Sequence, residues 1–130
     1  MKVNNPETLA DVMACIQCYE NAVAANDVAT LNELFWSDAL ALRYGYKENL
    51  YGYRAISEYR NTRTPASEAK RIATSVITSF GSHFATANID FVRAHRRGRQ
   101  SQTWVRMPEG WRIVAAHVSY LETNTITEEP

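Results

Sequence analysis

Arginine and tyrosine side chains are concentrated between residues 34 and 63, where asparagine and glutamate accompany them at a density that a connecting segment does not need. Arg43 lies in the middle of a predicted short strand, residues 41–45. A guanidinium group inside a strand requires an anion, and its fork of N–H donors matches a carboxylate in a bidentate way. The alternative is a structural ion pair with Glu48 or Asp38. The stretch therefore predicts a site for a small polar, anionic molecule.

The phenol of Tyr19 is a second candidate for chemistry, and it lies on the apolar stripe of a predicted first helix. A tyrosine in that place can be a core residue whose hydroxyl is hydrogen-bonded. Beside an arginine, however, the positive charge lowers the pKa of the phenol and makes it a proton donor or acceptor. Tyr19 and Arg43 are therefore candidates for a catalytic pair that projects into one cavity, and the structural roles remain the alternative for both.

Seven further polar or aromatic residues are predicted to bind the substrate: Tyr44, Asn49, Arg60, Gln102, Trp104, His117 and Ser119. Alternation along the last two predicted strands groups Gln102 with Trp104, and His117 with Ser119. If these parities face the helices, the floor of the cavity is polar. A hydrogen-bonded structural role is the alternative for His117.

Several kinds of chemistry have no matching motif in this sequence. The three histidines are scattered without ligand spacing, so we expect no structural or catalytic metal. There is no Gly-x-Ser-x-Gly elbow, phosphate-binding loop or dinucleotide fingerprint, and we expect no cofactor. Cys15 and Cys18 have the spacing of a redox pair but lie within a predicted helix, away from its N-terminus. Packed, reduced thiols are expected there instead.

Composition and charge narrow the class of partner. The 130 residues carry no net formal charge at pH 7, and the longest basic run is Arg96-Arg97. We therefore expect neither a nucleic-acid nor a membrane partner. No stretch approaches the ~20 apolar residues of a membrane span, and the first residues contain no apolar signal segment, so a cytoplasmic protein is expected.

Helical periodicity dominates the first half of the chain. Asn5-Pro6-Glu7 predicts a capped helix start, Asp27 predicts the cap of a second helix, and a third helix is predicted over residues 53–62 with Arg60 on its inner face. Alternation of period two then predicts four strands, residues 71–80, 83–93, 98–107 and 111–121. Turns are predicted at residues 81–82, 96–98 and 108–110. The polar tail, residues 122–130, is expected to fray.

Three helices followed by a meander of long strands predict one α+β domain over residues 1–130, with the helices packed on one face of a curved antiparallel sheet. The opposite face is assigned Val114, Ala116 and Val118, together with Thr103 and Val105. Such an apolar stripe would be exposed to solvent in a monomer, so we expect a homodimer formed through the sheets.

The order of elements and the final strand, Trp111-Arg-Ile-Val-Ala-Ala-His-Val-Ser119, resemble the nuclear-transport-factor-2/SnoaL-like superfamily. The resemblance implies a cone-shaped fold with a pocket. That superfamily includes ketosteroid isomerases, dehydratases and non-catalytic binding domains.

A closer resemblance covers nearly the whole chain. Its blocks are Tyr19-Glu20, Asn26-Asp27, Leu34-Phe35-Trp36, Arg43-Tyr44-Gly45, residues 48–52 and residues 98–106. These blocks are similar to the AtzH-like family, which includes the HpxZ proteins linked to oxalurate catabolism.

The AtzH-like resemblance implies a small carboxylated urea or ureide as substrate, and an amidase of the same pathway as partner. Hydrolysis of dicarboxyurea to allophanate is the activity proposed for the cyanuric-acid branch of the family. A tyrosine on the first helix and an arginine on the first strand are implicated there, and they fall on Tyr19 and Arg43 here. We therefore expect a cofactor-independent amidohydrolase of nitrogen catabolism that acts on a small, anionic, nitrogen-rich substrate.

Two other functions remain open at this point. The chain can be a non-catalytic ligand-binding or accessory protein of an amidase, because no residue is an obvious base for activating water. It can also be a proton-transfer enzyme of the ketosteroid-isomerase or dehydratase type, which requires Asp38, Asp90 or His117 in the pocket.

Overall fold

The computed structural model describes residues 1–65 and 68–122, which form three helices and six strands. The helices are α1 (Pro6–Ala25), α2 (Val28–Leu34) and α3 (Tyr53–Thr62). The strands are β1 (Leu42–Tyr44), β2 (Asn49–Tyr51), β3 (Arg71–Phe80), β4 (Phe84–Arg93), β5 (Arg96–Met107) and β6 (Gly110–Tyr120). The predicted α+β class and the order of its elements are confirmed.

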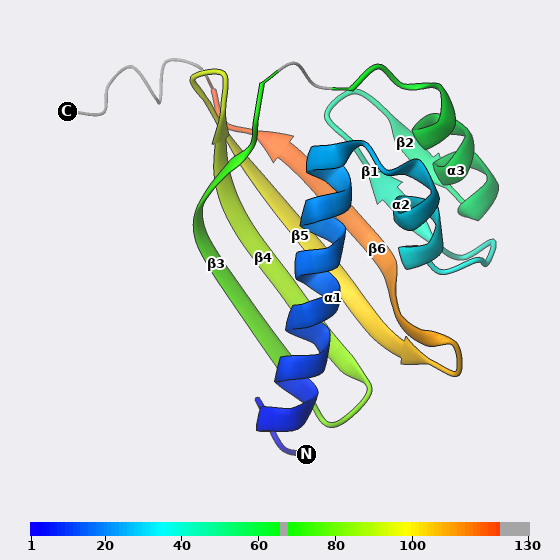
Figure 1. Ribbon diagram of the computed structural model, residues 1–130, viewed down its shortest axis with the longest axis vertical. Coiled ribbons are helices and arrows are strands. Elements are labelled where there is room, and N and C mark those ends of the chain that lie inside the picture. Colours follow the sequence, from blue (N-terminus) through cyan, green and yellow to red (C-terminus); the bar gives the residue numbers. More distant parts are fainter. Residues whose placement is uncertain (66–67, 123–130) are drawn as a thin grey trace.

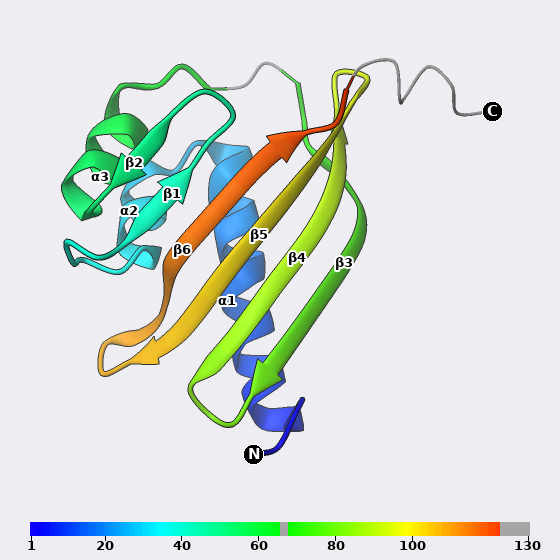
Figure 2. The same cartoon turned by 180° about the vertical axis from the view of Figure 1, so that it is seen from behind.

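One curved sheet contains all six of these strands, in the order β2-β1-β6-β5-β4-β3. Neighbouring strands are antiparallel except β1 and β6, which are parallel. The helix α1 lies lengthwise across one face, and α2 and α3 lie at the end that holds β1 and β2 (Figure 1). Figure 2 shows the opposite face, which no helix of the described chain covers. We call this uncovered side the outer face.

Local signals explain how α1 presents its tyrosine. The Oδ1 atom of Asn5 accepts hydrogen bonds from the backbone N–H groups of Glu7 and Thr8, at 3.1 and 3.3 Å, so the helix starts where the sequence predicts. The buried residues of α1 then follow the three-and-four spacing of one helix face: Thr8, Val12, Ile16, Tyr19 and Ala22. Tyr19 therefore faces the sheet.

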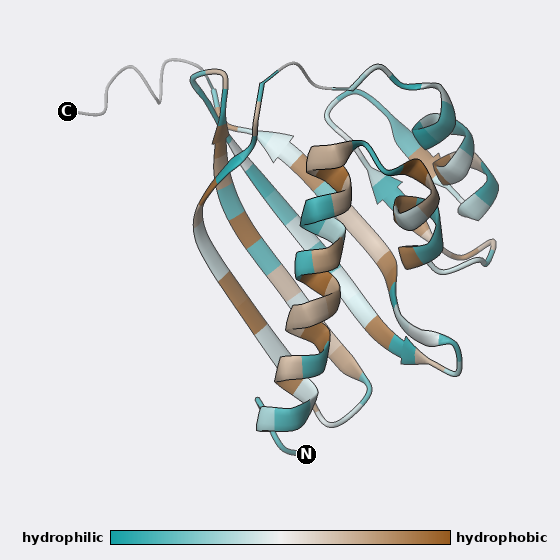
Figure 3. Cartoon of the chain, in the orientation of Figure 1, coloured by the Kyte–Doolittle hydropathy of each residue, from teal (hydrophilic) through white to brown (hydrophobic). Residues whose placement is uncertain are grey.

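The core lies between the helices and the inner face of the sheet. Its largest fully buried side chains include Trp104, Phe35, Phe91, Leu31 and Ile56. Burial alternates along β4, and Figure 3 shows the alternation as successive hydrophobic and hydrophilic bands. The covered face of the sheet is therefore apolar at its middle.

A β-bulge in β6 changes which residues face the helices. Trp104 pairs with Ile113, but the preceding Thr103 pairs with Ala115, so Val114 is an extra residue in the strand. Before the bulge Ile113 faces inward, and after it Ala116 is buried while His117 is exposed. The predicted outer position is therefore wrong for Ala116 and Val118, because the bulge shifts the inward parity by one residue.

The turn between β4 and β5 also differs from the prediction. Residues 96–98 were expected to form it, but Arg96 and Arg97 belong to β5. The turn is made by Ala94 and His95, whose φ angles are +51° and +67°. The mutual pairing of Arg93 with Arg96 leaves only these two residues between the strands.

Four other expectations have separate outcomes. Both cysteines are free. Cys15 is partly buried, and burial is the main cause that raises the pKa of its thiol. Cys18 is exposed, so the prediction of a packed thiol is wrong for that residue. No helix in the described part of the chain is long and apolar enough to span a membrane. The fraying predicted for residues 122–130 lies outside the described residues, except at Glu122. The homodimer stays a prediction, without Ala116 and Val118 to support it.

Gly98 provides a test of the packing beneath the site. It pairs with Phe91, and a Cβ at position 98 would overlap the Phe91 ring. We expect Gly98→Ala to lower the free energy of unfolding by roughly 1–3 kcal/mol, the usual cost of overpacking, in a urea denaturation series. The control is Arg99→Ala, an exposed neighbour in the same strand. Equal midpoints for the two variants would show that the ring moves away at no cost.

Candidate active site

A cavity of about 310 Å³ opens among α1, α3, the β1–β2 turn and the ends of strands β4, β5 and β6. Seven of its lining residues are cationic: Arg43, Lys47, Arg60, Arg63, Lys70, Arg93 and Arg96. Among the described lining residues only Glu48 has a carboxylate. We call this cavity the arginine pocket. Its excess of positive charge suits a small anion.

Arg43 enters the pocket because β1 alternates, with its side chain buried on the inner face while its neighbours turn outward. Its Nη1 atom donates to Oε1 of Glu48 at 3.0 Å, and its guanidinium lies over the Tyr59 ring, 5.1 Å from the centroid. The ion pair with Glu48 that the sequence left open is therefore present. The other candidate, Asp38, accepts a hydrogen bond from the backbone N–H of Leu40 instead.

The turn after β1 contains Gly45 and brings the Glu48 side chain back to Arg43. The backbone N–H of Gly45 donates to the carbonyl oxygen of Glu48 at 2.8 Å. A Cβ at position 45 would overlap the Glu48 carboxylate and approach the guanidinium of Arg43 closely. Gly45 therefore permits the close approach that places the single lining carboxylate on Arg43.

Tyr19 and Arg60 meet inside the pocket from two helices that are far apart in the sequence. The Nη2 atom of Arg60 donates to the Tyr19 hydroxyl at 2.7 Å, and both side chains are buried. The same guanidinium lies over the rings of Tyr19 and Phe35, with centroid distances of 5.8 and 5.9 Å. Its Nε atom is buried and has no hydrogen-bond partner among the described residues. The hydrogen bond holds the phenol oxygen against a positive charge.

These charges decide the acidity of Tyr19. Burial by itself raises the pKa of the phenol, because it penalises the charged form. The positive charges of Arg60, Arg43 and Lys70 together outweigh burial and the opposing effect of Glu20, so the pKa of Tyr19 is lowered. At a given pH a larger fraction of the Tyr19 phenol is therefore ionised, and able to accept a proton, than of an ordinary tyrosine.

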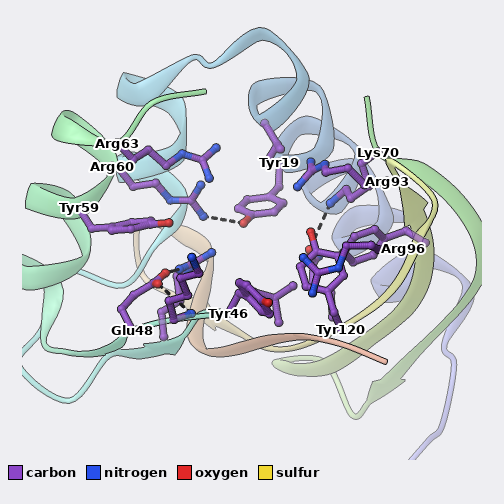
Figure 4. A pocket seen from close by; sticks show the side chains of 16 residues that line it. Tyr19, Tyr46, Glu48, Tyr59, Arg60, Arg63, Lys70, Arg93, Arg96 and Tyr120 are labelled. Atoms are coloured by element: carbon purple, nitrogen blue, oxygen red, sulfur yellow. Dashed lines mark hydrogen bonds and ion pairs between the residues drawn. The ribbon is translucent and has the colours of Figure 1, made fainter. Parts of the chain in front are cut away.

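Lys70 is neutralised within the fold. Its Nζ atom lies 2.6 Å from Oε1 of Glu20, and Gln100 bridges the pair by donating to Glu20 and accepting from Lys70, each at 3.2 Å. Four arginines of the pocket have no carboxylate within ion-pair distance in the described part of the chain: Arg60, Arg63, Arg93 and Arg96. Figure 4 shows them on both sides of Tyr19. The pocket therefore retains several unneutralised positive charges.

The structure brings together three of the predicted site residues, Tyr19, Arg43 and Arg60, around the arginine pocket. Gln102 also faces the helices and lines a smaller space beside Tyr19 and Arg43. Its Oε1 atom accepts a hydrogen bond from Nε1 of Trp104 at 3.0 Å, while Trp104 itself is fully buried in the core. Trp104 therefore holds Gln102 rather than reaching the pocket.

The side chains of four other predicted residues lie on the outer face or its edge. The Tyr44 ring meets that of His117 edge to face, with centroids 5.6 Å apart, and the hydroxyl of Ser119 accepts from Arg99 at 3.2 Å. Asn49 is exposed opposite Tyr44. The placement predicted for His117 and Ser119 is corrected by the bulge, and that of Tyr44 by its alternation with inward-facing Arg43.

Sequence reasoning missed several residues of the pocket: Arg63, Lys70, Arg93, Arg96, Tyr46, Tyr59 and Tyr120. The helical spacing of Arg63, three residues after Arg60 and four after Tyr59, was a usable signal. Arg93 and Arg96 were hidden because the turn was predicted two residues too late. No group of three or more histidine, cysteine, aspartate or glutamate residues in the described chain can hold a metal ion.

The fold and the pocket define a nuclear-transport-factor-2-like protein, a class in which helices close a cavity over a curved sheet. The sequence profile of the AtzH-like family matches residues 1–124, and the chain belongs to that family.

Similar solved structures support this assignment. A protein of unknown function of the DUF3225 family from Pectobacterium atrosepticum is 49% identical, with a TM-score of 0.90 over 92% of this chain and 95% of that one. A cystatin-like fold protein from Burkholderia xenovorans is 40% identical, with a TM-score of 0.89 over 93% and 97%. A nuclear transport factor 2-like protein from Salmonella enterica, 23% identical with a TM-score of 0.75 over 95% and 98%, shares the fold. No curated protein matches the chain.

The acidity of Tyr19 can be tested by titration. We expect the tyrosinate absorbance of the wild type to contain one component below the ordinary pKa of about 10, and Tyr19→Phe to remove it. A lowered native pKa stabilises the fold fully above the unfolded pKa, and this stabilisation is lost as pH falls through the native value. The advantage of the wild type over Tyr19→Phe in free energy of unfolding should therefore grow as pH rises towards about 10.

The matched control is Tyr53→Phe, which removes a hydroxyl that donates to the backbone carbonyl of Asn32 outside the pocket. It should leave the low-pKa component in place. If Tyr19→Phe removes only absorbance that titrates at or above the ordinary value, the cations do not act on the phenol as described.

Proposed function

We propose that the protein is a small, cofactor-independent amidohydrolase that acts on a carboxylated urea or ureide in the catabolism of nitrogen compounds. The observation that carries the proposal is the buried phenol of Tyr19, hydrogen-bonded to Arg60 and lowered in pKa by three cations. An ionised phenol can serve as the base that activates water, a role for which the sequence alone offered no obvious candidate. Membership of the AtzH-like family supports the choice of substrate class.

Arg43 is assigned to the substrate carboxylate. Only its Nη1 atom has a hydrogen-bond partner in the described chain, which is Glu48. The remaining N–H groups of the guanidinium are available for a carboxylate or for the developing negative charge on a carbonyl oxygen. Arg60 stays on the Tyr19 hydroxyl and keeps the phenol oxygen in one place.

Water is assigned to a small space beside the pocket. A cavity of about 10 Å³ is lined by residues that include Tyr19, Arg43, Gln100 and Gln102, and this volume is near the lower limit for one water molecule. The Nε2 atom of Gln102 is buried with no hydrogen-bond partner in the described part of the chain, and its Oε1 atom accepts from Nε1 of Trp104. A water molecule in this space can therefore accept from Gln102 and donate to the Tyr19 phenolate.

The reaction follows from these positions. The Tyr19 phenolate takes a proton from water as the water oxygen bonds to the substrate carbonyl carbon, and Arg43 stabilises the resulting oxyanion. The C–N bond then breaks, its electron pair goes to nitrogen, and Tyr19 returns its proton to that nitrogen. Amide and water become a carboxylate, an amine and one released proton. Tyr19 ends as it began.

The two alternative functions can be compared with the same geometry. A proton-transfer enzyme of the isomerase type needs a free pocket carboxylate, yet the carboxylate of Glu48 is paired with Arg43. Neither Asp38 nor Asp90 lines the arginine pocket, and His117 is exposed on the outer face. A non-catalytic accessory protein of an amidase is favoured by one observation, which is that Glu48 already occupies part of Arg43. Kinetics of the purified protein separate catalysis from binding.

We expect the wild type to hydrolyse carboxylated urea substrates without added metal or cofactor. Tyr19→Phe should lower kcat by roughly 10²-fold or more with little change in KM, because only the proton-transfer group is lost. Arg43→Lys keeps the charge and loses the bidentate fork, so it should impair kcat/KM nearly as much as Arg43→Ala. The measurement is steady-state release of product, with melting temperatures recorded for every variant.

Tyr53→Phe again serves as the matched control and should retain wild-type rates. Full activity in folded Tyr19→Phe and Arg43→Lys would exclude the assigned roles. Saturable binding of the same substrates with no turnover, by the protein alone and with an amidase present, would favour the accessory function.

A further inference from the structure

The end of the β4–β5 hairpin places two arginines side by side at the pocket. Arg93 is the last residue of β4, Arg96 is the first of β5, and they are direct cross-strand partners. Directly opposed residues of an antiparallel pair project to the same face of the sheet, and both line the arginine pocket. The two-residue turn between them keeps Ala94 and His95 at positive φ, a conformation that non-glycine residues adopt at a cost.

This pair is unfavourable within the protein itself. Like charges directly opposite each other destabilise a strand pair. No carboxylate lies within ion-pair distance of either guanidinium in the described part of the chain, and the Nε atom of Arg93 is buried without a hydrogen-bond partner. Asp90, the acid of β4, has its Oδ2 atom 3.7 Å from Nη2 of Arg97 instead. A strained turn therefore maintains a charge pair that lacks an internal counter-ion.

Aromatic rings orient these guanidinium groups. Arg96 lies over the rings of Tyr46 and Tyr120, 4.5 and 4.0 Å from their centroids, and Arg93 lies 5.8 Å from the centroid of Phe91. Contact through a face leaves the N–H donors, which lie in the guanidinium plane, free at the edges. Arg96 is therefore held ready to donate to a planar anionic group.

We propose that Arg93 and Arg96 form a second anion subsite of the arginine pocket, which binds a second anionic group of the ligand. Figure 4 shows these two arginines on one side of Tyr19, with Arg60 and Glu48 on the other. The ligand is then a small dianion, with two carboxylates or with one carboxylate and one phosphate, because the cavity measures about 310 Å³. The assignment of this dianion as a substrate rests on the proposed function, whereas its binding does not.

Calorimetric titration with simple acids tests the subsite. The probes are acetate, malonate, succinate and glutarate, and we expect at least one dicarboxylate to bind about tenfold or more tightly than acetate. Arg93→Gln should abolish that preference and leave acetate affinity within about twofold of wild type, because acetate needs only Arg43. Arg96→Gln should act in the same direction. Phosphoglycolate is compared with malonate, and the tighter of the two identifies the group that the subsite prefers.

The matched control is Arg99→Gln, which removes the same charge from β5, the strand of Arg96, but on the outer face, where Arg99 donates to Ser119. It should keep the dicarboxylate preference. The proposal is overturned if no dicarboxylate or phosphoglycolate binds more tightly than acetate, or if Arg93→Gln weakens acetate and the dianions by the same factor. The second result would mean that Arg93 contributes only to the overall positive potential of the pocket and does not bind a particular anionic group.

These experiments can contradict the anion subsite and the proposed hydrolysis separately. Tyr19→Phe, which tests the hydrolysis, should still prefer the dicarboxylate in calorimetry. A wild type that prefers dicarboxylates but hydrolyses nothing would contradict the proposed function and support the subsite. Hydrolysis without any preference for dianions would do the reverse.

Discussion

Positive charge that the protein does not neutralise within its described part is the constraint on which the rest of the site depends. Seven cationic side chains line a small cavity together with the carboxylate of Glu48. Arg43 pairs with Glu48 and Lys70 with Glu20, and the other five have no ion pair within the described chain. Arg60 is the buried member of this unpaired set, and a buried charge without an ionic partner is costly, so rigid packing must hold it in place. The aromatic rings around the arginines and the core beneath them supply that support.

The same charges determine what Tyr19 can do. In an apolar pocket its phenol would be harder to ionise, because burial disfavours the charged form. Arg60, Arg43 and Lys70 reverse that effect, and the hydrogen bond from Arg60 keeps the phenol oxygen in place. One electrostatic arrangement therefore both attracts an anion and prepares a base, which relates the binding of the ligand to the proposed reaction.

Local signals in the sequence were sufficient for much of this architecture. The caps at Asn5 and Asp27, the helical spacing along α1 and the helix over residues 53–62 are short-range effects of side chains on their own backbone. Helical spacing also predicts the inward position of Tyr19 and Arg60. The alternation of a strand turns Arg43 inward, and the order of helices and strands gives the α+β class. The AtzH-like blocks identified the family before any tertiary information was available.

Only the tertiary structure decided which residues share the pocket. The bulge at Val114 shifts His117 and Ser119 outward, and it arises from pairing with β5 rather than from any preference of its own residue. The turn at Ala94 and His95 contains no glycine, so nothing local marks the hairpin that brings Arg93 opposite Arg96. The pKa of Tyr19 likewise depends on charges 24 to 51 positions away in the chain. Strand register and long-range electrostatics act between distant segments, and a single sequence read locally determines neither.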